Sequence, residues 1–193
     1  VMMTLVDFTD PGLIILPPHR LVRGISKPTL NELTAKMKVL FEIEELPLST
    51  PGVWKRVDDL LAETNEISSI LFGPAAGSLF VLRLRDLAAV SQMMPHFHSE
   101  LYQRLDVSIV DHIILEKLLG LSSDKEKTTL TYSYDRLDAV NRVSAEEYQL
   151  ALLLSPIKAT TIKAIADIGD KMPRKSTYFY PKLPAGLILN RLV

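Results

Sequence analysis

The regular alternation of strand and helix signals constrains the fold of this chain more than any other sequence feature. Short runs of Val, Ile, Leu, Thr and aromatic residues, typical of strands, are followed by stretches whose apolar residues recur at helical spacing. In the second half the order is strand, helix, strand, helix, strand, at 129–134, 136–143, 149–154, 159–168 and 176–180. Strands that alternate with short helices are typical of βαβ units. We therefore expect an α/β or α+β fold with a mixed sheet, flanking helices and a C-terminal part of the βαβ type.

The first half of the chain contains the same kinds of element in a less regular order. Strands are predicted at 1–6, 13–16, 41–43, 67–72 and 79–84, and helices from Thr29 onward, at 51–63 and at 109–119. The turn Asp10-Pro11-Gly12 separates the first two strands, and a five-residue loop that starts at Gly73 separates the last two. Each of these two pairs of strands is expected to form a hairpin.

The helix at 109–119 is expected to be largely buried, because apolar residues dominate it. Asp106 or Ser108 would cap its start, and Gly120 would end it. The polar segment 122–127 that follows is the most plausible linker. It divides the chain into a mixed α+β part, 1–121, and a βαβαβ part, 128–193, which could also pack as one compact domain.

The composition excludes several classes of protein. The chain has 193 residues and no cysteine, which excludes disulfides, thiolate metal sites, iron–sulfur clusters and a cysteine nucleophile. No apolar run approaches the roughly 18 residues of a membrane-spanning helix, so we expect a cytoplasmic protein. The sequence opens at Val1 inside a predicted strand, and we expect it to be part of a longer protein.

The net charge of -1 conceals an uneven distribution. Residues 155–193 contain seven basic and two acidic side chains, so they carry +5, and the rest of the chain carries -6. A local positive excess can attract phosphate, nucleotide or nucleic acid, although it can also be a solvated basic face or can dock on the acidic part of the same chain.

The segment 171–182 concentrates cations, hydroxyls and aromatic rings between Pro173 and Pro181. Its candidate ligand-binding residues are Lys171, Arg174, Lys175, Ser176, Thr177, Tyr178, Tyr180 and Lys182. On a strand, Ser176, Tyr178 and Tyr180 would share one face. The structural alternative is an edge strand with Phe179 packed inward. His19 and Arg20, at the end of another predicted strand, complete the candidate ligand-binding set.

Two further histidines, His96 and His98, are spaced so that both could reach a metal ion from one strand. No carboxylate or third histidine lies close to them in the sequence. We therefore predict no metal site, and no catalytic residue or cofactor can be named from the sequence. His112 is expected to pack within its apolar helix.

Three segments of the sequence resemble a known family. They are VMMTLVDFTDPGLIILPPHRLV at the start, LDVSIVDHIILEKLLG in the middle and MPRKSTYFYPKLPAGLILN at the end. Over essentially the whole chain they resemble the C-terminal half of the prokaryotic domain-of-unknown-function family numbered one thousand and fifteen. The resemblance implies an N-terminal half, similar to ParB-like and free-serine-kinase-like proteins, whose histidine-rich segment would lie near His19 and Arg20. It implies no reaction.

Three functions follow from these features. The first is a module that binds a phosphorylated small molecule or a nucleotide as part of a larger enzyme. In it the cations would hold the anion, Ser176 and Thr177 would donate hydrogen bonds, and Tyr178 or Tyr180 would stack on a ring or help to transfer a proton. The second is a nucleic-acid-associated, ParB-like module whose affinity would fall steeply with salt. The third is a structural or dimerisation domain, in which the basic segment pairs with the acidic face of a second copy.

Overall fold

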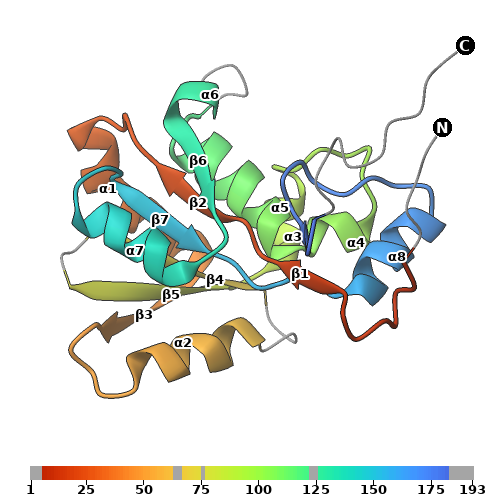
Figure 1. Ribbon diagram of the computed structural model, residues 1–193. Helices are drawn as coiled ribbons and strands as arrows, with labels where there is room; N and C mark the ends of the chain where they lie inside the picture. The colour runs from red at the N-terminus through yellow and green to blue at the C-terminus, as the bar shows by residue number, and fades with distance from the viewer. Residues whose placement is uncertain (1–5, 63–66, 75–76, 122–125, 183–193) are drawn as a thin grey trace, which may run out of the picture.

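The computed structural model describes residues 6–62, 67–74, 77–121 and 126–182 (Figure 1). Almost all of the predicted strand at 1–6, and most of the polar segment at 122–127, lie outside these ranges. The described strands are β1 (Ile14–Leu16), β2 (His19–Val22), β3 (Phe41–Pro47), β4 (Ser68–Phe72), β5 (Ser78–Leu84), β6 (Leu130–Ser133), β7 (Leu150–Leu153) and β8 (Tyr178–Tyr180). Six of them form one sheet in the order β3-β5-β4-β7-β2-β6, and β1 pairs with β8 in a separate two-stranded sheet.

Helices connect most of these strands. They are α1 (Lys27–Leu40), α2 (Val53–Ala62), α3 (Leu87–Ser91), α4 (Glu100–Gln103), α5 (Asp106–Ser108), the π-helix η1 (Ile109–Leu118), α6 (Glu126–Thr129), α7 (Arg136–Ser144) and α8 (Ala159–Asp167). In Figure 1, α1 lies at one end of the molecule and α8 at the other. The predicted α/β fold class is confirmed.

The predicted βαβ pattern takes a split form. Strands β6 and β7 both pair antiparallel with β2, which lies between them, so they are parallel to each other and α7 connects them. In the same way, α2 connects β3 and β4 on the two sides of β5. Neighbouring strands in the six-stranded sheet are therefore antiparallel, although the helical connections join parallel strands.

One of the two predicted hairpins is present among the described residues, and the strand of the other has a different partner. The hairpin of β4 and β5 is confirmed, with Phe72 opposite Leu79. The strand predicted at 13–16 is confirmed as β1, and its partner among the described residues is β8, with Leu16 opposite Tyr178. This pairing brings the C-terminal aromatic segment beside the start of the chain.

Two hydrophobic layers enclose the six-stranded sheet. Alternate residues of β7 face opposite sides: Leu152 packs in the layer that contains α1 and η1, and Leu153 packs in the layer that contains α2 and α7. Both faces of the central strands are therefore buried, which explains why these strands read as continuous apolar runs in the sequence.

The buried helix predicted at 109–119 is confirmed in its position, but the prediction of its cap is wrong. Asp106 is the first residue of α5 rather than its cap, and neither Asp106 nor Ser108 caps through its side chain. The carboxyl of Asp106 lies beside Ser155 and the backbone of Ser68 instead, and its burial raises its pKa to about 7. Gly120, with φ of 67°, ends η1 as predicted.

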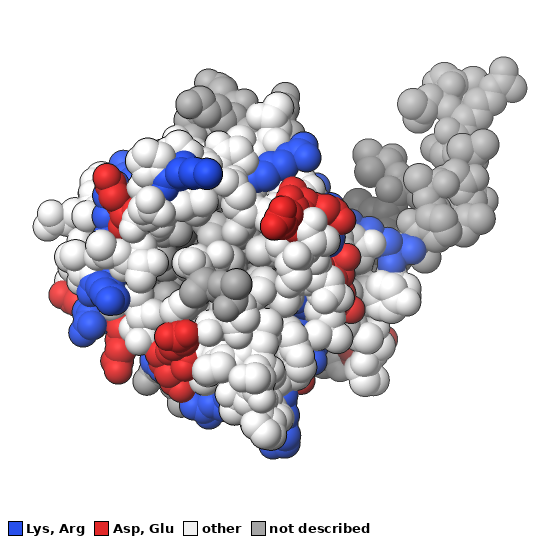
Figure 2. All heavy atoms as spheres, turned by 90° about the vertical axis from the view of Figure 1, so that its left-hand side faces the viewer, with Lys and Arg blue, Asp and Glu red and all other residues white. Residues whose placement is uncertain are grey.

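Charged side chains of both signs are interspersed on the face of the molecule shown in Figure 2. On that face, basic and acidic residues alternate among uncharged ones, without separating into a positive and a negative region. No helix in the described ranges is long and apolar enough to span a membrane.

Candidate functional site

A cleft of about 300 Å³ opens at one end of the strands of the six-stranded sheet, where β2 begins and β6 and β7 end. We call it the His19 cleft. Its lining includes Leu16, His19, Asp58, Tyr134, Asp135 and Arg136. They come from β1, β2, α2, the β6–α7 connection and the start of α7, so only the tertiary structure assembles them.

His19 contributes a neutral imidazole to this cleft. It is buried, and its Nδ1 accepts a hydrogen bond of 3.1 Å from the backbone N–H of Leu154. The proton of the neutral ring must therefore sit on Nε2, which can donate to a ligand. Burial, and then the positive charge of Arg20, lowers the pKa of His19 to about 4.

The pKa of His19 predicts an acid-dependent loss of stability. Its value lies below the usual 6.5, so the unfolded chain binds more protons between these two pH values, and the free energy of unfolding falls as pH falls. Between pH 6 and 4.5 we expect the native chain to lose about 2 kcal/mol more than His19→Asn, which keeps an acceptor for Leu154. Urea unfolding at both pH values measures the difference, and His96→Asn, at an exposed histidine, is the control. Equal pH dependence of the native chain and His19→Asn would contradict this assignment.

Arg136 brings a positive charge to the His19 cleft. It is the first residue of α7, whose N-cap Asp135 accepts hydrogen bonds from the backbone N–H of Leu137 and Asp138. One guanidinium nitrogen, Nη2, donates to Asp58 at 2.9 Å. The Nε atom is buried and has no hydrogen-bond partner among the described residues. A buried N–H group without a partner in the protein is rare in folded proteins.

Two tyrosines and a lysine contact one another beside the cleft, with the two tyrosine rings tilted by 39°. The ring of Tyr134, which lines the cleft, lies 4.1 Å from the ring of Tyr178, centroid to centroid. The Nζ of Lys182 lies 4.5 Å from the centroid of the Tyr178 ring. Strand pairing explains the placement, because Tyr178 of β8 lies opposite Leu16 of β1, which also lines the cleft.

Arg20 points away from the cleft, because successive side chains of a strand face opposite sides. Its side chain is fully buried, and Nε and Nη2 each donate to Asp111 of η1 at 2.9 Å. Nη1 donates to the carbonyl oxygen of Pro18 at 2.6 Å, and the guanidinium lies 5.4 Å from the centroid of Tyr132. Its donors are used within the protein, and we assign it a structural role.

The remaining candidate residues precede β8 or lie at its far end. Lys171, Arg174 and Lys175 are exposed, and none of them lines the His19 cleft. Within the described part of the chain, the side chains of Arg174 and Lys175 take part in no ion pair. The three other candidates differ in exposure: Ser176 is buried, Thr177 is half-buried and Tyr180 is exposed. Of the predicted set, the structure therefore brings together His19, Tyr178 and Lys182.

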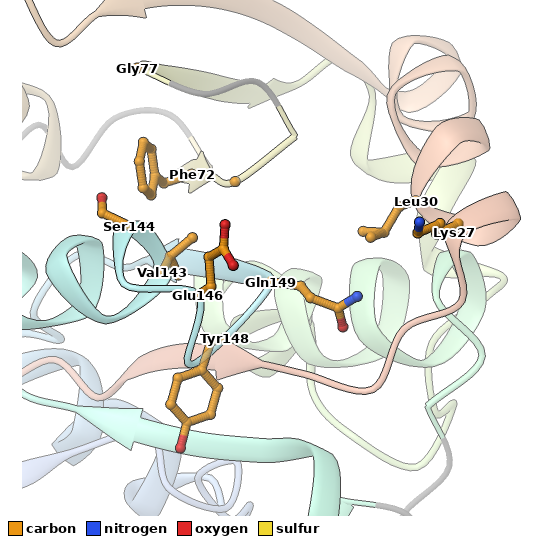
Figure 3. Close-up of a pocket in the computed structure, with 10 residues that line it drawn as sticks. Lys27, Leu30, Phe72, Gly77, Val143, Ser144, Glu146, Tyr148 and Gln149 are labelled. Carbon is orange, nitrogen blue, oxygen red and sulfur yellow. The ribbon is translucent and has the colours of Figure 1, made fainter.

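A larger groove, of about 800 Å³, opens at the opposite end of the strands, where β4 ends and β5 and β7 begin (Figure 3). None of the candidate residues from the sequence lines it. The Gln149 amide is engaged on both sides by the backbone of Ile25, and the Tyr148 ring points away from the groove, with its hydroxyl accepting from Arg142. The Gln149 amide and the Tyr148 hydroxyl therefore already have partners within the protein. Because the candidate residue His19 lines the other cleft, with Tyr178 and Lys182 beside it, we favour the His19 cleft as the functional site.

Four residues that line the cleft are not predicted from the sequence: Asp58, Tyr134, Asp135 and Arg136. A local signal existed for three of them, because Tyr134-Asp135-Arg136 follows a predicted strand and opens a predicted helix, where sites often form. No local signal existed for Asp58, which lies in the middle of an amphipathic helix. In the described ranges, no group of three or more His, Asp or Glu side chains is arranged for a metal ion.

Comparisons with known proteins connect this geometry to a family and a fold. The sequence model of the family described as a protein of unknown function, DUF1015, matches residues 1–108. No curated protein matches the sequence. The fold resembles a conserved hypothetical protein from Pyrococcus furiosus, with a TM-score of 0.53 and 17% identity over 94% of this chain and 62% of that one. It also resembles a free serine kinase solved in complex with AMP, with a TM-score of 0.51 and 16% identity over 91% of this chain and 57% of the kinase. The chain therefore spans about three fifths of the length of these two proteins.

Proposed function

We propose that this chain, which belongs to the DUF1015 family of proteins of unknown function, binds a nucleotide or another phosphorylated small molecule at the His19 cleft. The observation that carries the proposal is the cluster of Tyr134, Tyr178 and Lys182 beside a cleft that also contains Arg136. The AMP bound to the structurally similar kinase supports the choice of a nucleotide.

Each part of the site suits a part of a nucleotide. A purine base can stack on a tyrosine ring, an interaction that is available to every base because each base has a flat aromatic face. The guanidinium of Arg136, whose side chain is 33% exposed, and the Nζ of Lys182 can bind phosphate oxygens, with charge-assisted hydrogen bonds that are about twice as strong as neutral ones. The Nε2–H of His19 can donate to a ribose or phosphate oxygen without adding a charge.

The activity of the whole protein extends beyond this chain. Because the chain spans about three fifths of its structural relatives, we propose that the nucleotide-binding unit works with a further region, as part of a larger enzyme. The cytoplasmic location, the nucleic-acid alternative and the homodimer stay predictions from the sequence. So do the ligand-binding roles of Lys171, Arg174, Lys175, Ser176, Thr177 and Tyr180.

Isothermal titration of the protein with AMP and with ADP tests the proposal. We expect binding to the native chain, and an increase in Kd of about tenfold or more for Tyr178→Ala, since stacking of one base on an aromatic ring contributes ~1–3 kcal/mol. Arg136→Ala should weaken ADP binding by a similar factor. Arg104→Ala removes an exposed arginine paired with Glu100 and is the matched control, expected to leave Kd unchanged. Absence of binding to the native chain, or an equal loss in the Arg104→Ala control, would overturn the proposal.

A further inference from the structure

A second arrangement of reactive groups lies away from the His19 cleft, where a turn after α3 meets the segment after α8. The Nδ1 of His98 is 2.7 Å from Oδ1 of Asp170, a residue 72 positions away. Both side chains are largely covered, with exposed fractions of 16% for His98 and 12% for Asp170. His98 lies in a turn rather than on a strand, so it does not share a metal ion with His96 in the way the sequence spacing allowed.

Backbone groups hold the Asp170 carboxylate in place and keep it ionised. The N–H of Ser99 donates to Oδ2 at 2.7 Å, and the N–H of Lys171 donates to Oδ1 at 2.7 Å. These hydrogen bonds, that of Ser99 above all, hold the pKa of Asp170 well below its usual range. An ionised carboxylate accepts only, so Nδ1 of His98 donates to it, and in the neutral form of the ring Nε2 has the free lone pair.

The imidazole is also fixed in orientation. It stacks on the ring of Tyr102, with centroids 3.7 Å apart and planes 4° from parallel. Tyr102 is in turn held by His112, whose Nε2 lies 3.0 Å from the tyrosine hydroxyl. The Nε2 of His98 has no hydrogen-bond partner in the described ranges. A carboxylate-oriented imidazole with its second nitrogen open is the arrangement of a nucleophile or a general base.

The surroundings favour an anionic reaction partner. Three cations, Lys171, Arg174 and Lys175, follow Asp170 within five residues, and all three are exposed. Such a local positive charge attracts phosphorylated molecules to the neighbourhood of the imidazole.

We infer that His98 is a nucleophile that accepts a phosphoryl group on Nε2, with Asp170 as its positioning residue. The donor is a small molecule with a reactive phosphoryl group, such as an acyl phosphate or phosphoramidate. The Nε2 lone pair forms the new N–P bond, and the bond from phosphorus to the leaving group breaks, with its electron pair leaving on that group. The ring keeps the proton on Nδ1, and its positive charge is stabilised by the Asp170 carboxylate and by the face of Tyr102.

Labelling of the intact chain with phosphoramidate tests this inference independently of nucleotide binding. Mass spectrometry of peptides should find the phosphoryl group on His98, and phosphorus NMR should identify an N–P bond. His96, two residues away and exposed, serves as an internal control in the same molecule. We expect it to react more slowly than His98, because it has no carboxylate partner in the described part of the chain. Labelling of His96 at an equal or higher rate would overturn the inference.

The role of Asp170 has a separate test. Asp170→Asn removes the charge and keeps one side-chain oxygen acceptor, where the carboxylate uses Oδ1 for Lys171 and Oδ2 for Ser99. We expect phosphorylation about tenfold to a hundredfold slower, the rate equivalent of one charge-assisted hydrogen bond. Proton NMR should show the downfield Nδ1 proton of His98 in the native chain and its loss in Asp170→Asn, which shows whether the carboxylate holds this proton. An unchanged rate in Asp170→Asn, or labelling of His98→Ala as fast as the native chain, would contradict the assignment.

Discussion

Replacing Arg20 by alanine is expected to lower the free energy of unfolding by about 3 kcal/mol or more, the loss typical of breaking a buried ion pair on one side. The side chain of Arg20 is fully buried, while that of its partner Asp111 is 26% exposed. Its removal leaves the Asp111 carboxylate and the carbonyl oxygen of Pro18 without their donors. Partial hydration of Asp111 places the expected loss at the lower end of the range known for buried pairs.

Urea unfolding of the native chain and of two further variants measures this effect. Arg104→Ala, which removes an exposed arginine from its pair with Glu100, is the matched control and should change stability by less than about 1 kcal/mol. The double variant Arg20→Met, Asp111→Leu removes both charges, and we expect it to be more stable than Arg20→Ala alone. If Arg20→Ala were no more destabilising than Arg104→Ala, the structural role of Arg20 would be wrong.

Gly73→Ala is the second substitution with a large expected effect, a loss of at least about 3 kcal/mol. Gly73 follows β4 with φ of 127°, a backbone conformation that side chains rarely adopt. A Cβ at this position would overlap the backbone carbonyl oxygen of Gln149 and come within 3.0 Å of a methyl group of Leu150. Because Gln149 leads into β7 at the centre of the sheet, the overlap cannot be relieved by moving a flexible side chain.

Gly77 provides the matched control for Gly73. It also has a positive φ, of 81°, but nothing lies within 4 Å of the position of its Cβ. Gly77→Ala therefore adds conformational strain without overlap, and we expect it to cost about 1 kcal/mol. The difference between the two urea midpoints, at unchanged slope, isolates the contribution of the close approach. Equal losses would show that strain alone, and not the contact with Gln149, fixes this position.

Local patterns accounted for most of the helices and strands. The helices at 136–143 and 159–168 and the hairpin of β4 and β5 formed where spacing and turn residues predicted them, because these signals act between residues close in the chain. The cap of the helix at 109–119 was an exception, since packing buried Asp106 instead.

The candidate site was only partly visible in the sequence. His19, Tyr178 and Lys182 were singled out for their chemistry and their place at strand ends, and the structure brings them to one edge of the molecule. Arg20 was singled out with His19, but alternation along β2 turned it to the opposite face, where η1 supplies its counterion.

The sequence by itself determined the α/β class, the positions of most elements and the positive charge of the C-terminal segment, because composition and periodicity are properties of neighbouring residues. Only the tertiary structure decided the partners. Arg20 pairs with Asp111 across 91 positions, His98 with Asp170 across 72, and β1 with β8 from the opposite end of the chain. Such pairings depend on how strands and helices pack together, and the distance between two residues along the chain does not specify their distance in the fold.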